Sequence, residues 1–137
     1  MSVQTIIAQL AVLQAEITGI RQAFAETPDK LNAFPCFVNF PSEGDIDRAP
    51  SQRKVKHIIK MQLRVTRADL PSAENKVRPF LDLVLDKFDA NISLNGTAHR
   101  SAITHYDYGE LPWGGRTYLG ISFDIEVWEE IPKTFET

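Results

Sequence analysis

The feature that most constrains this fold is a strict alternation of side-chain types near the middle of the chain. Between residues 54 and 66, one row of alternate side chains consists of Val55, His57, Ile59, Met61, Leu63 and Val65. The other row consists of Lys54, Lys56, Ile58, Lys60, Gln62, Arg64 and Thr66. A period of two is typical of a β-strand with one buried face and one exposed face. We therefore predict a long strand whose outer face is basic.

A second alternating segment lies near the end of the chain. Its apolar row is Thr117, Leu119, Ile121, Phe123, Ile125 and Val127. Its other row runs from Tyr118 through Gly120, Ser122, Asp124 and Glu126 to Trp128, and Glu130 follows in the same register. The pattern predicts a second long strand, with an outer face that is acidic where the first is basic.

Two segments have the periodicity of amphipathic helices. Apolar residues from Ile6 to Phe24 recur every three or four positions, and Thr27-Pro28-Asp29 is expected to stop that helix. A second helix is predicted from Ser72, as its N-cap, to Asp89. Pro79 lies within it, so the helix either starts near this residue or is kinked there.

The remaining segments predict shorter strands and connections. Strand candidates are residues 33–40, 92–94 and 102–108, with a hairpin turn at Asn95-Gly96. Exposed loops are expected at residues 41–52 and 109–115, the second with an exposed Trp113. The expected fold is a single α+β domain over residues 1–137. It has a mixed, mainly antiparallel sheet with two helices packed on one face.

Composition narrows the function. The 137 residues carry a net charge of −3, which disfavours a domain that binds the phosphate backbone of nucleic acids. The single cysteine, Cys36, excludes an internal disulfide and lies in an apolar run, so we expect a buried, unreactive thiol. The first residues have neither the basic region of a signal peptide nor a membrane span, which predicts a cytoplasmic protein.

Candidate chemistry is sparse. His105 and Asp107 would point to the same side of a strand, either as a base with its orienting carboxylate or as two metal ligands. The competing interpretation is an exposed polar row, and no spacing selects a third catalytic group. His57 is expected to be a hydrogen-bonded core histidine. No motif indicates a cofactor or a metal, so we predict no catalytic, cofactor-binding or metal-binding residues.

The basic row by itself would suit a nucleic-acid or anionic-lipid surface. The acidic row is complementary to it, however, and two interpretations of the complementary rows rank above nucleic-acid binding. They pair across strands within one sheet, or they pair between subunits arranged head to tail, which generates closed rings. Strands this long often project beyond their own core, which also favours assembly. The candidate interface residues are Lys54, Lys56, Lys60, Arg64, Asp124, Glu126, Glu130, Glu43, Asp45, Asp47, Arg48 and Trp113.

The layout of nearly the whole chain resembles the tail terminator, or tail completion, proteins of long-tailed bacteriophages, including the lambda tail terminator. The resemblance consists of an amphipathic N-terminal helix, a polar loop before the basic strand at Lys54 to Arg67, and a middle helix at Ser72 to Asp89. A turn with glycine and aromatic residues follows, and then the segment from Arg116 to Val127. Pro79 has no place in the family pattern.

The resemblance implies a small structural subunit of the virion that is assembled in the host cytoplasm. Six copies would form a ring at the head-proximal end of the tail tube, stop tube polymerisation and offer a docking surface to the head connector. It implies partners in the tail tube protein and the neck proteins, and neither a catalytic site nor a cofactor. Head–tail adaptors and other neck proteins share much of this layout and stay as alternatives, with a small enzyme using His105 and Asp107 as a more distant one.

Overall fold

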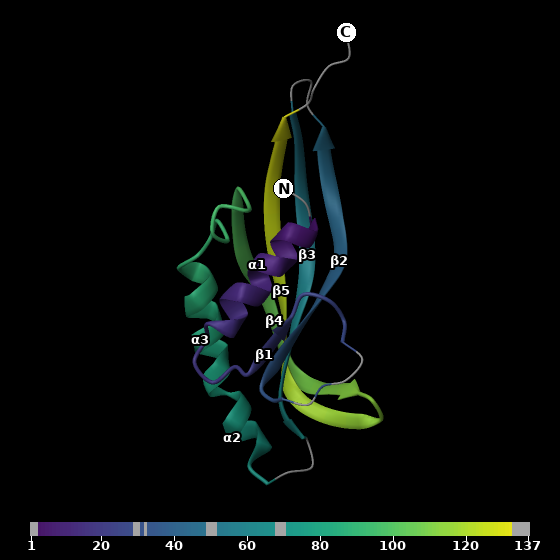
Figure 1. The fold of residues 1–137 in the computed structure, drawn as a ribbon, viewed down its shortest axis with the longest axis vertical. Helices are drawn as coiled ribbons and strands as arrows, with labels where there is room; N and C mark the ends of the chain where they lie inside the picture. Colours follow the sequence, from purple (N-terminus) through teal and green to yellow (C-terminus); the bar gives the residue numbers. More distant parts are fainter. Residues whose placement is uncertain (1–2, 29–30, 32, 49–51, 68–70, 133–137) are drawn as a thin grey trace.

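The computed structural model describes residues 3–28, 31, 33–48, 52–67 and 71–132, which form three helices and five strands (Figure 1). The helices are α1 (Val3–Ala15), α2 (Ala73–Val77) and α3 (Pro79–Asp89). The strands are β1 (Gln22–Phe24), β2 (Cys36–Arg48), β3 (Gln52–Arg67), β4 (Arg100–Trp113) and β5 (Arg116–Pro132).

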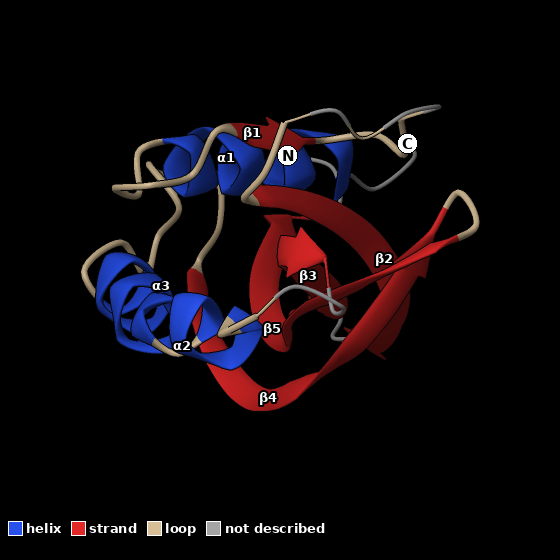
Figure 2. Cartoon of the chain, turned by 90° about the horizontal axis from the view of Figure 1, so that it is seen from below, coloured by secondary structure: helices blue, strands red, loops and turns tan. Residues whose placement is uncertain are grey.

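The strands form one sheet in the order β1-β2-β3-β5-β4. The pairing of β1 with β2 is parallel, and the other pairings are antiparallel. The two alternating segments of the sequence are therefore the neighbouring central strands β3 and β5. The sheet is strongly curved, as Figure 2 shows. The α+β class with a mixed, mainly antiparallel sheet is confirmed.

The apolar rows of β3 and β5 build the core. Ile59, Met61 and Leu63 on β3 are fully buried, and so are Ile121 and Phe123 on β5. Apolar side chains of α1, α2 and α3 belong to the same cluster, including Ile6, Leu10, Leu13, Val77, Val84 and Phe88. Burial of this apolar surface is the main source of stability. That the helices cover a single face of the sheet stays a prediction.

A β-bulge interrupts the pairing of the central strands. The register shifts between Arg64, which pairs with Gly120, and Thr66, which pairs with Leu119, so Val65 is the extra residue. A Cβ atom at Gly120 would collide with the carbonyl oxygen of Leu63. Glycine at this position therefore permits the close approach of the two backbones.

The first helix is shorter than its apolar period predicts. It ends at Ala15, and Gly19 turns the chain with a φ of +94°. Residues 22–24 then form β1 instead of a last helical turn, and the Arg21 N–H donates to the Pro35 carbonyl at 2.9 Å. Parallel pairing with β2 outweighs the weak local helical preference of this segment.

A buried amide pair fixes α1 against the sheet. Gln14 lies outside the apolar stripe of the first helix, yet it is fully buried, with 0% of its surface exposed. Its partner Asn39 on β2 is 2% exposed. The Gln14 Nε2 donates to the Asn39 Oδ1 at 2.7 Å, and the Asn39 Nδ2 donates back to the Gln14 Oε1 at 2.9 Å. The Asn39 amide also donates to the Phe24 carbonyl on β1 at 3.0 Å. These bonds satisfy polar groups that would be costly to bury alone.

The predicted middle helix is divided into two at Arg78, and the second helix starts at Pro79. α2 ends at Val77, and α3 begins with Pro79 at its first position, where the missing N–H costs nothing. Ser72 occupies the N-cap position of α2 as expected, but not with the usual cap geometry. Its φ is 58°, and its side chain makes no capping hydrogen bond.

Two expected loops and one expected strand are also wrong. Residues 41–48 belong to β2 and Gln52 to β3, while residues 49–51 of the expected loop lie outside the described residues. Residues 109–113 belong to β4, which leaves a two-residue turn at Gly114-Gly115 with φ of 57° and 80°. Residues 92–94 form turns and not a strand, although Asn95 and Gly96 do turn the chain with positive φ. In the first two cases a neighbouring strand supplies hydrogen bonds to polar segments that have no apolar period of their own.

Candidate functional site

The two charged rows lie side by side on the outer face of β3 and β5. The ion pairs are Lys54 with Glu130 at 3.8 Å, Lys56 with Glu126 at 3.7 Å, and Lys60 with Asp124 at 3.1 Å. The first and last pairs join residues directly opposite in the register, and the middle pair is diagonal. This is cross-strand pairing within one sheet, one of the two interpretations left open by the sequence.

These pairs are partly solvated, and exposed ion pairs of this kind contribute about 0–1 kcal/mol each. Their acidic partners also neutralise the lysines that a phosphate backbone would need. The basic row therefore gives little support to nucleic-acid binding. An interface role for the six residues of these ion pairs stays a prediction. Because their charges are already paired within the subunit, unpaired charge does not argue for that role.

Arg64 differs from the other cations of its row, because it is 3% exposed and pairs with no carboxylate among the described residues. Its Nη2 donates to the Gln62 Oε1 at 3.0 Å and to the Pro112 carbonyl at 3.2 Å. Its guanidinium lies 5.1 Å from the centre of the Trp113 ring. Burial lowers the pKa of Arg64, against the opposing influence of Cys36 and then Tyr118.

These contacts change the interpretation of two predicted interface residues. Arg64 is a buried bridge from β3 to the β4–β5 hairpin and not an exposed cation, and the expected exposure of Trp113 is wrong because its ring is half-buried over Arg64. The Nε and Nη1 of Arg64 make no hydrogen bond within the described residues. The alternation of the strand does not predict the burial of Arg64, which comes with its contacts to Pro112 and Trp113 of the β4–β5 hairpin.

The second half of β2 forms an exposed arm, residues 41–48, which pairs with the first half of β3. All eight residues are exposed, including the predicted interface residues Glu43, Asp45, Asp47 and Arg48. Asp45 makes an ion pair with Lys56 at 3.5 Å. Ile46 is the large apolar side chain of the arm, and it is 56% exposed.

The candidate catalytic pair forms as the strand period predicts. His105 Nε2 lies 3.0 Å from Asp107 Oδ2 on the edge strand β4. The two side chains are 59% and 74% exposed, and neither belongs to a described cavity lining. The arrangement fits an exposed polar row better than a site that orients a substrate and excludes water.

Sequence reasoning did not single out Glu129 as a buried carboxylate. Glu129 lies on the inward row of β5 and is 2% exposed. Its Oε1 lies 2.5 Å from the Nε2 of His57 on the neighbouring strand β3. His57 makes the expected hydrogen bond on the inward row, but its side chain is 20% exposed, so it lies at the border of the core. The strand period of two predicts the inward position of His57. The same period places Glu129 on the inward row of β5, two residues after Val127.

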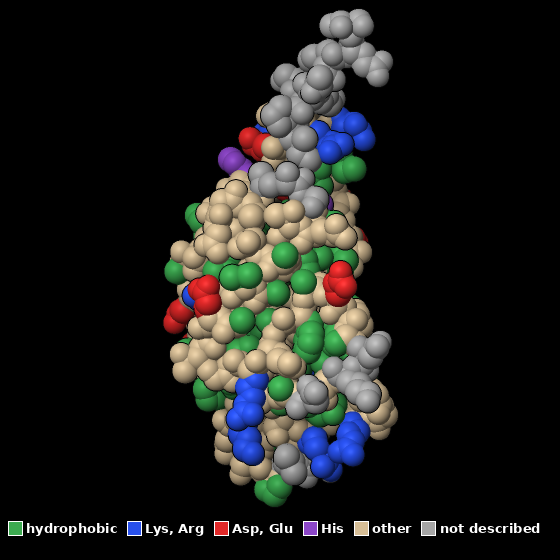
Figure 3. Space-filling model, in the orientation of Figure 1, with side chains coloured by type: hydrophobic (Ala, Val, Ile, Leu, Met, Phe, Trp, Pro, Cys, Tyr) green, Lys and Arg blue, Asp and Glu red, His purple; other side chains and the backbone are tan. Residues whose placement is uncertain are grey.

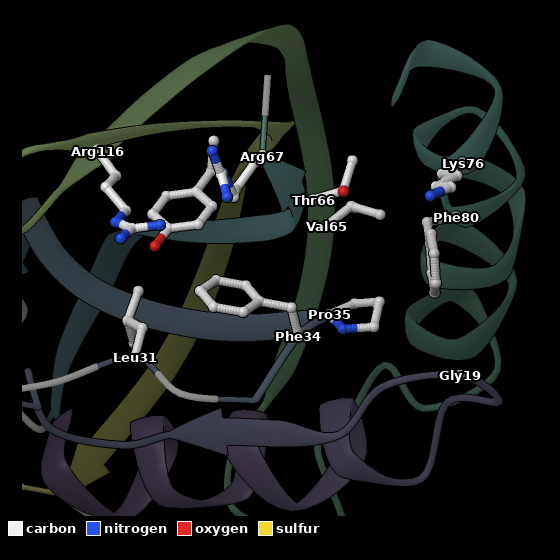
Figure 4. Close-up of a pocket in the computed structure, with 11 residues that line it drawn as sticks. Gly19, Leu31, Phe34, Pro35, Val65, Thr66, Arg67, Lys76, Phe80 and Arg116 are labelled. Carbon is white, nitrogen blue, oxygen red and sulfur yellow. The ribbon is translucent and has the colours of Figure 1, made fainter. Parts of the chain in front are cut away.

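A basic groove lies at the end of the sheet where β3 leads toward α2. Its volume is about 820 Å³, and its lining includes Phe34, Tyr118, Phe80, Arg67, Lys76 and Arg116. The Phe34 and Tyr118 rings stack with centroids 4.6 Å apart. Figure 4 shows Arg67 and Arg116 on one side and Lys76 and Phe80 across from them. Sequence reasoning missed this groove because its lining comes from segments far apart in the chain.

Metal-binding and membrane-spanning features find no support among the described residues. Among the described residues, no group of three or more His, Cys, Asp or Glu side chains could hold a metal ion. None of the described helices has the length and apolar character needed to cross a membrane. No protein-family model matches the chain, and no curated protein matches it.

Proposed function

We propose that this protein is a structural virion subunit that forms a ring at the head-proximal end of a phage tail tube. In this role it ends tube polymerisation and joins the tail to the head connector. The proposal rests on the sequence resemblance to tail terminators and on surfaces of the fold that lack a covering layer. It assigns the protein no catalytic role and no cofactor.

The observation that carries the proposal is the arm of β2. Residues 41–48 extend the antiparallel ladder of β2 with β3, yet every one of them is exposed. The arm is an open edge of the sheet, because β3 and then β5 lie on one side of it and β1 pairs only with residues 36–38. An open edge offers unpaired backbone groups to another chain. Ile46 adds an exposed apolar side chain at its centre. An arm of this kind is suited to packing against a neighbouring subunit.

The other edge of the sheet also favours assembly. β4 is an edge strand of 14 residues, where about five or six is typical. Tyr106 and Tyr108 are 44% and 46% exposed on it, and their rings meet edge to face at 5.7 Å. Exposed tyrosines on an unpaired edge are common in protein interfaces.

Native mass measured over a range of concentrations tests the proposal. We expect an assembly of about six times the 15.5 kDa subunit mass, and negative-stain images of a ring with a central hole. Ile46→Asp should shift the assembly toward monomer. Ile92→Asp is a matched control, because Ile92 is also 56% exposed but lies in the turns after α3.

A protein that stays monomeric at every concentration and forms no rings in the images would contradict the proposal. If Ile46→Asp and Ile92→Asp affect assembly equally, the arm is not part of the subunit interface. A head–tail adaptor or another neck protein remains the nearest alternative. It would differ by binding isolated connectors and not the ends of tail tubes.

The small-enzyme alternative has one observation in its favour, the 3.0 Å contact of His105 with Asp107. It requires an activity that is lost when both residues are replaced by Ala while the thermal unfolding midpoint is unchanged. An activity that survives the double substitution would eliminate this alternative.

A further inference from the structure

The basic groove combines two chemistries that suit one kind of ligand. Its described lining contains Arg67, Lys76 and Arg116 and no carboxylate. It also contains the stacked rings of Phe34 and Tyr118, with Phe80 on α3 across from them. Aromatic walls bind another ring, while the cations attract an anionic group beside it. The groove therefore fits a peptide in which an aromatic residue adjoins a carboxylate.

The chain contains such a peptide immediately after β5. Residues 133–137 lie outside the described residues, and their sequence is Lys-Thr-Phe-Glu-Thr. Phe135 supplies the ring, and Glu136 supplies the adjoining negative charge.

The distance from Pro132 to the groove decides whether the segment can come from the same chain or only from a second copy. Pro132 pairs with Gln52 at one end of the β3–β5 ladder, whereas Tyr118 of the groove pairs with Arg67 at the other end. At about 3.3 Å per residue, Tyr118 and Pro132 are roughly 46 Å apart along the strand. The segment from Pro132 to Glu136 spans at most about 14 Å. The segment therefore cannot reach the groove of its own chain.

The views of the molecule agree with this separation. β5 reaches its Pro132 end at the top of Figure 1, whereas α2 and the adjoining end of β3 lie at the bottom. In the same orientation, Figure 3 shows Lys and Arg side chains at the lower end and a second group of them near the upper end. A contact between the two ends is therefore a contact between two molecules.

We propose that the basic groove binds the Phe135-Glu136 segment of a second copy of this chain. The Phe135 ring packs against Phe34 and Phe80, and the Glu136 carboxylate pairs with Arg116 or Lys76. The contact is heterologous, because one end of each subunit meets the opposite end of the next, so it closes into a ring when the rotation permits. This inference rests on the proposed ring function and identifies its subunit contact.

A binding experiment isolates this contact from ring formation. The receptor is the full-length Phe135→Ala/Glu136→Lys variant, whose grooves are free of the native segment according to the proposal. The probe is a fluorescently labelled peptide of residues 131–137, followed by fluorescence polarisation. We expect saturable binding. Adding Arg116→Glu to the receptor should raise the dissociation constant at least about tenfold, equivalent to about 1.4 kcal/mol.

Two controls address charge and folding. Arg78→Glu in the same receptor makes an equal change in net charge, next to the same short helix but outside the groove lining, and should leave the dissociation constant unchanged. A peptide with the Phe135→Ala and Glu136→Lys changes should not bind. A circular dichroism melt verifies that the receptor variants are folded.

The outcomes separate this inference from the proposed function. Absence of saturable binding, or equal weakening by Arg116→Glu and Arg78→Glu, would overturn the inference. So would normal rings from the Phe135→Ala/Glu136→Lys variant, which would leave the ring function intact. A wild-type protein that stays monomeric while its variant binds the peptide through Arg116 would contradict the ring and still support recognition of the segment by the groove.

Discussion

The two halves of β2 belong to one strand and one hydrogen-bonded ladder, but their surroundings differ completely. Residues 36–39 are buried, and residues 41–48 are exposed. The register shift between Pro41 and Glu43 lies close to the boundary. The buried half pairs with β1 and contacts α1 through Asn39, whereas the arm has β3 on one edge only. Backbone pairing therefore sets the path of the strand, and the covering layer decides whether the strand contributes to the core.

The largest expected difference between the two halves is in core packing. Phe37→Ala removes a fully buried ring and should lower the free energy of unfolding by about 3–5 kcal/mol. Ile46→Ala on the arm should change it by less than about 0.5 kcal/mol. Urea denaturation under conditions that keep both variants monomeric measures the two values. A similar loss in both variants would show that the arm is stabilised within the monomer.

The next effect is in the buried polar contact. Gln14→Ala leaves the Asn39 side chain without its reciprocal partner and should cost about 1–3 kcal/mol. On the arm, Asp45→Ala breaks only an exposed ion pair and should cost a few tenths of a kcal/mol at most. The same denaturation series compares them. A nearly neutral Gln14→Ala would mean that water replaces the lost amide.

A third difference appears only at alkaline pH. Burial raises the pKa of the Cys36 thiol from 9.0 to about 11, with Arg64 opposing the shift. The thiol in the unfolded chain loses its proton at lower pH than in the folded chain, so the unfolded state binds fewer protons and stability falls as pH rises from about 9 to 11. Relative to Cys36→Ala, the wild-type protein should therefore lose stability across this window in urea titrations. Parallel losses in both proteins would assign the effect to other groups.

The smallest expected effect belongs to the outer charged face. A double-mutant cycle on Lys60→Ala and Asp124→Ala should give a coupling of about 0.2–1 kcal/mol that decreases with added salt. A coupling well above 1 kcal/mol in the monomer would make these pairs a structural element comparable to the core. If the coupling of Lys60 with Asp124 appears only in the assembled protein, this ion pair belongs to the subunit interface.

The candidate site was predictable only in part, for reasons that particular residues illustrate. Strand alternation placed Lys60 and Asp124 on matching rows, and it placed His105 and Asp107 on one side of β4. It could not show that the charged rows are neighbours, because the order of strands in a sheet is not encoded in their period. The basic groove was missed for the same reason, since Phe34, Lys76 and Arg116 meet only after the sheet has curved.

The sequence by itself determined the elements whose pattern has a clear period: the long central strands, the first turns of α1 and the inward position of His57. Periodicity is local, so it survives without knowledge of the partners. Only the tertiary structure decided that residues 41–48 are a strand, that residues 22–24 leave the helical pattern, and that Arg64 and Glu129 are buried. Each of these depends on a neighbour distant in the chain, which supplies a hydrogen-bonding edge or removes water from a charged group.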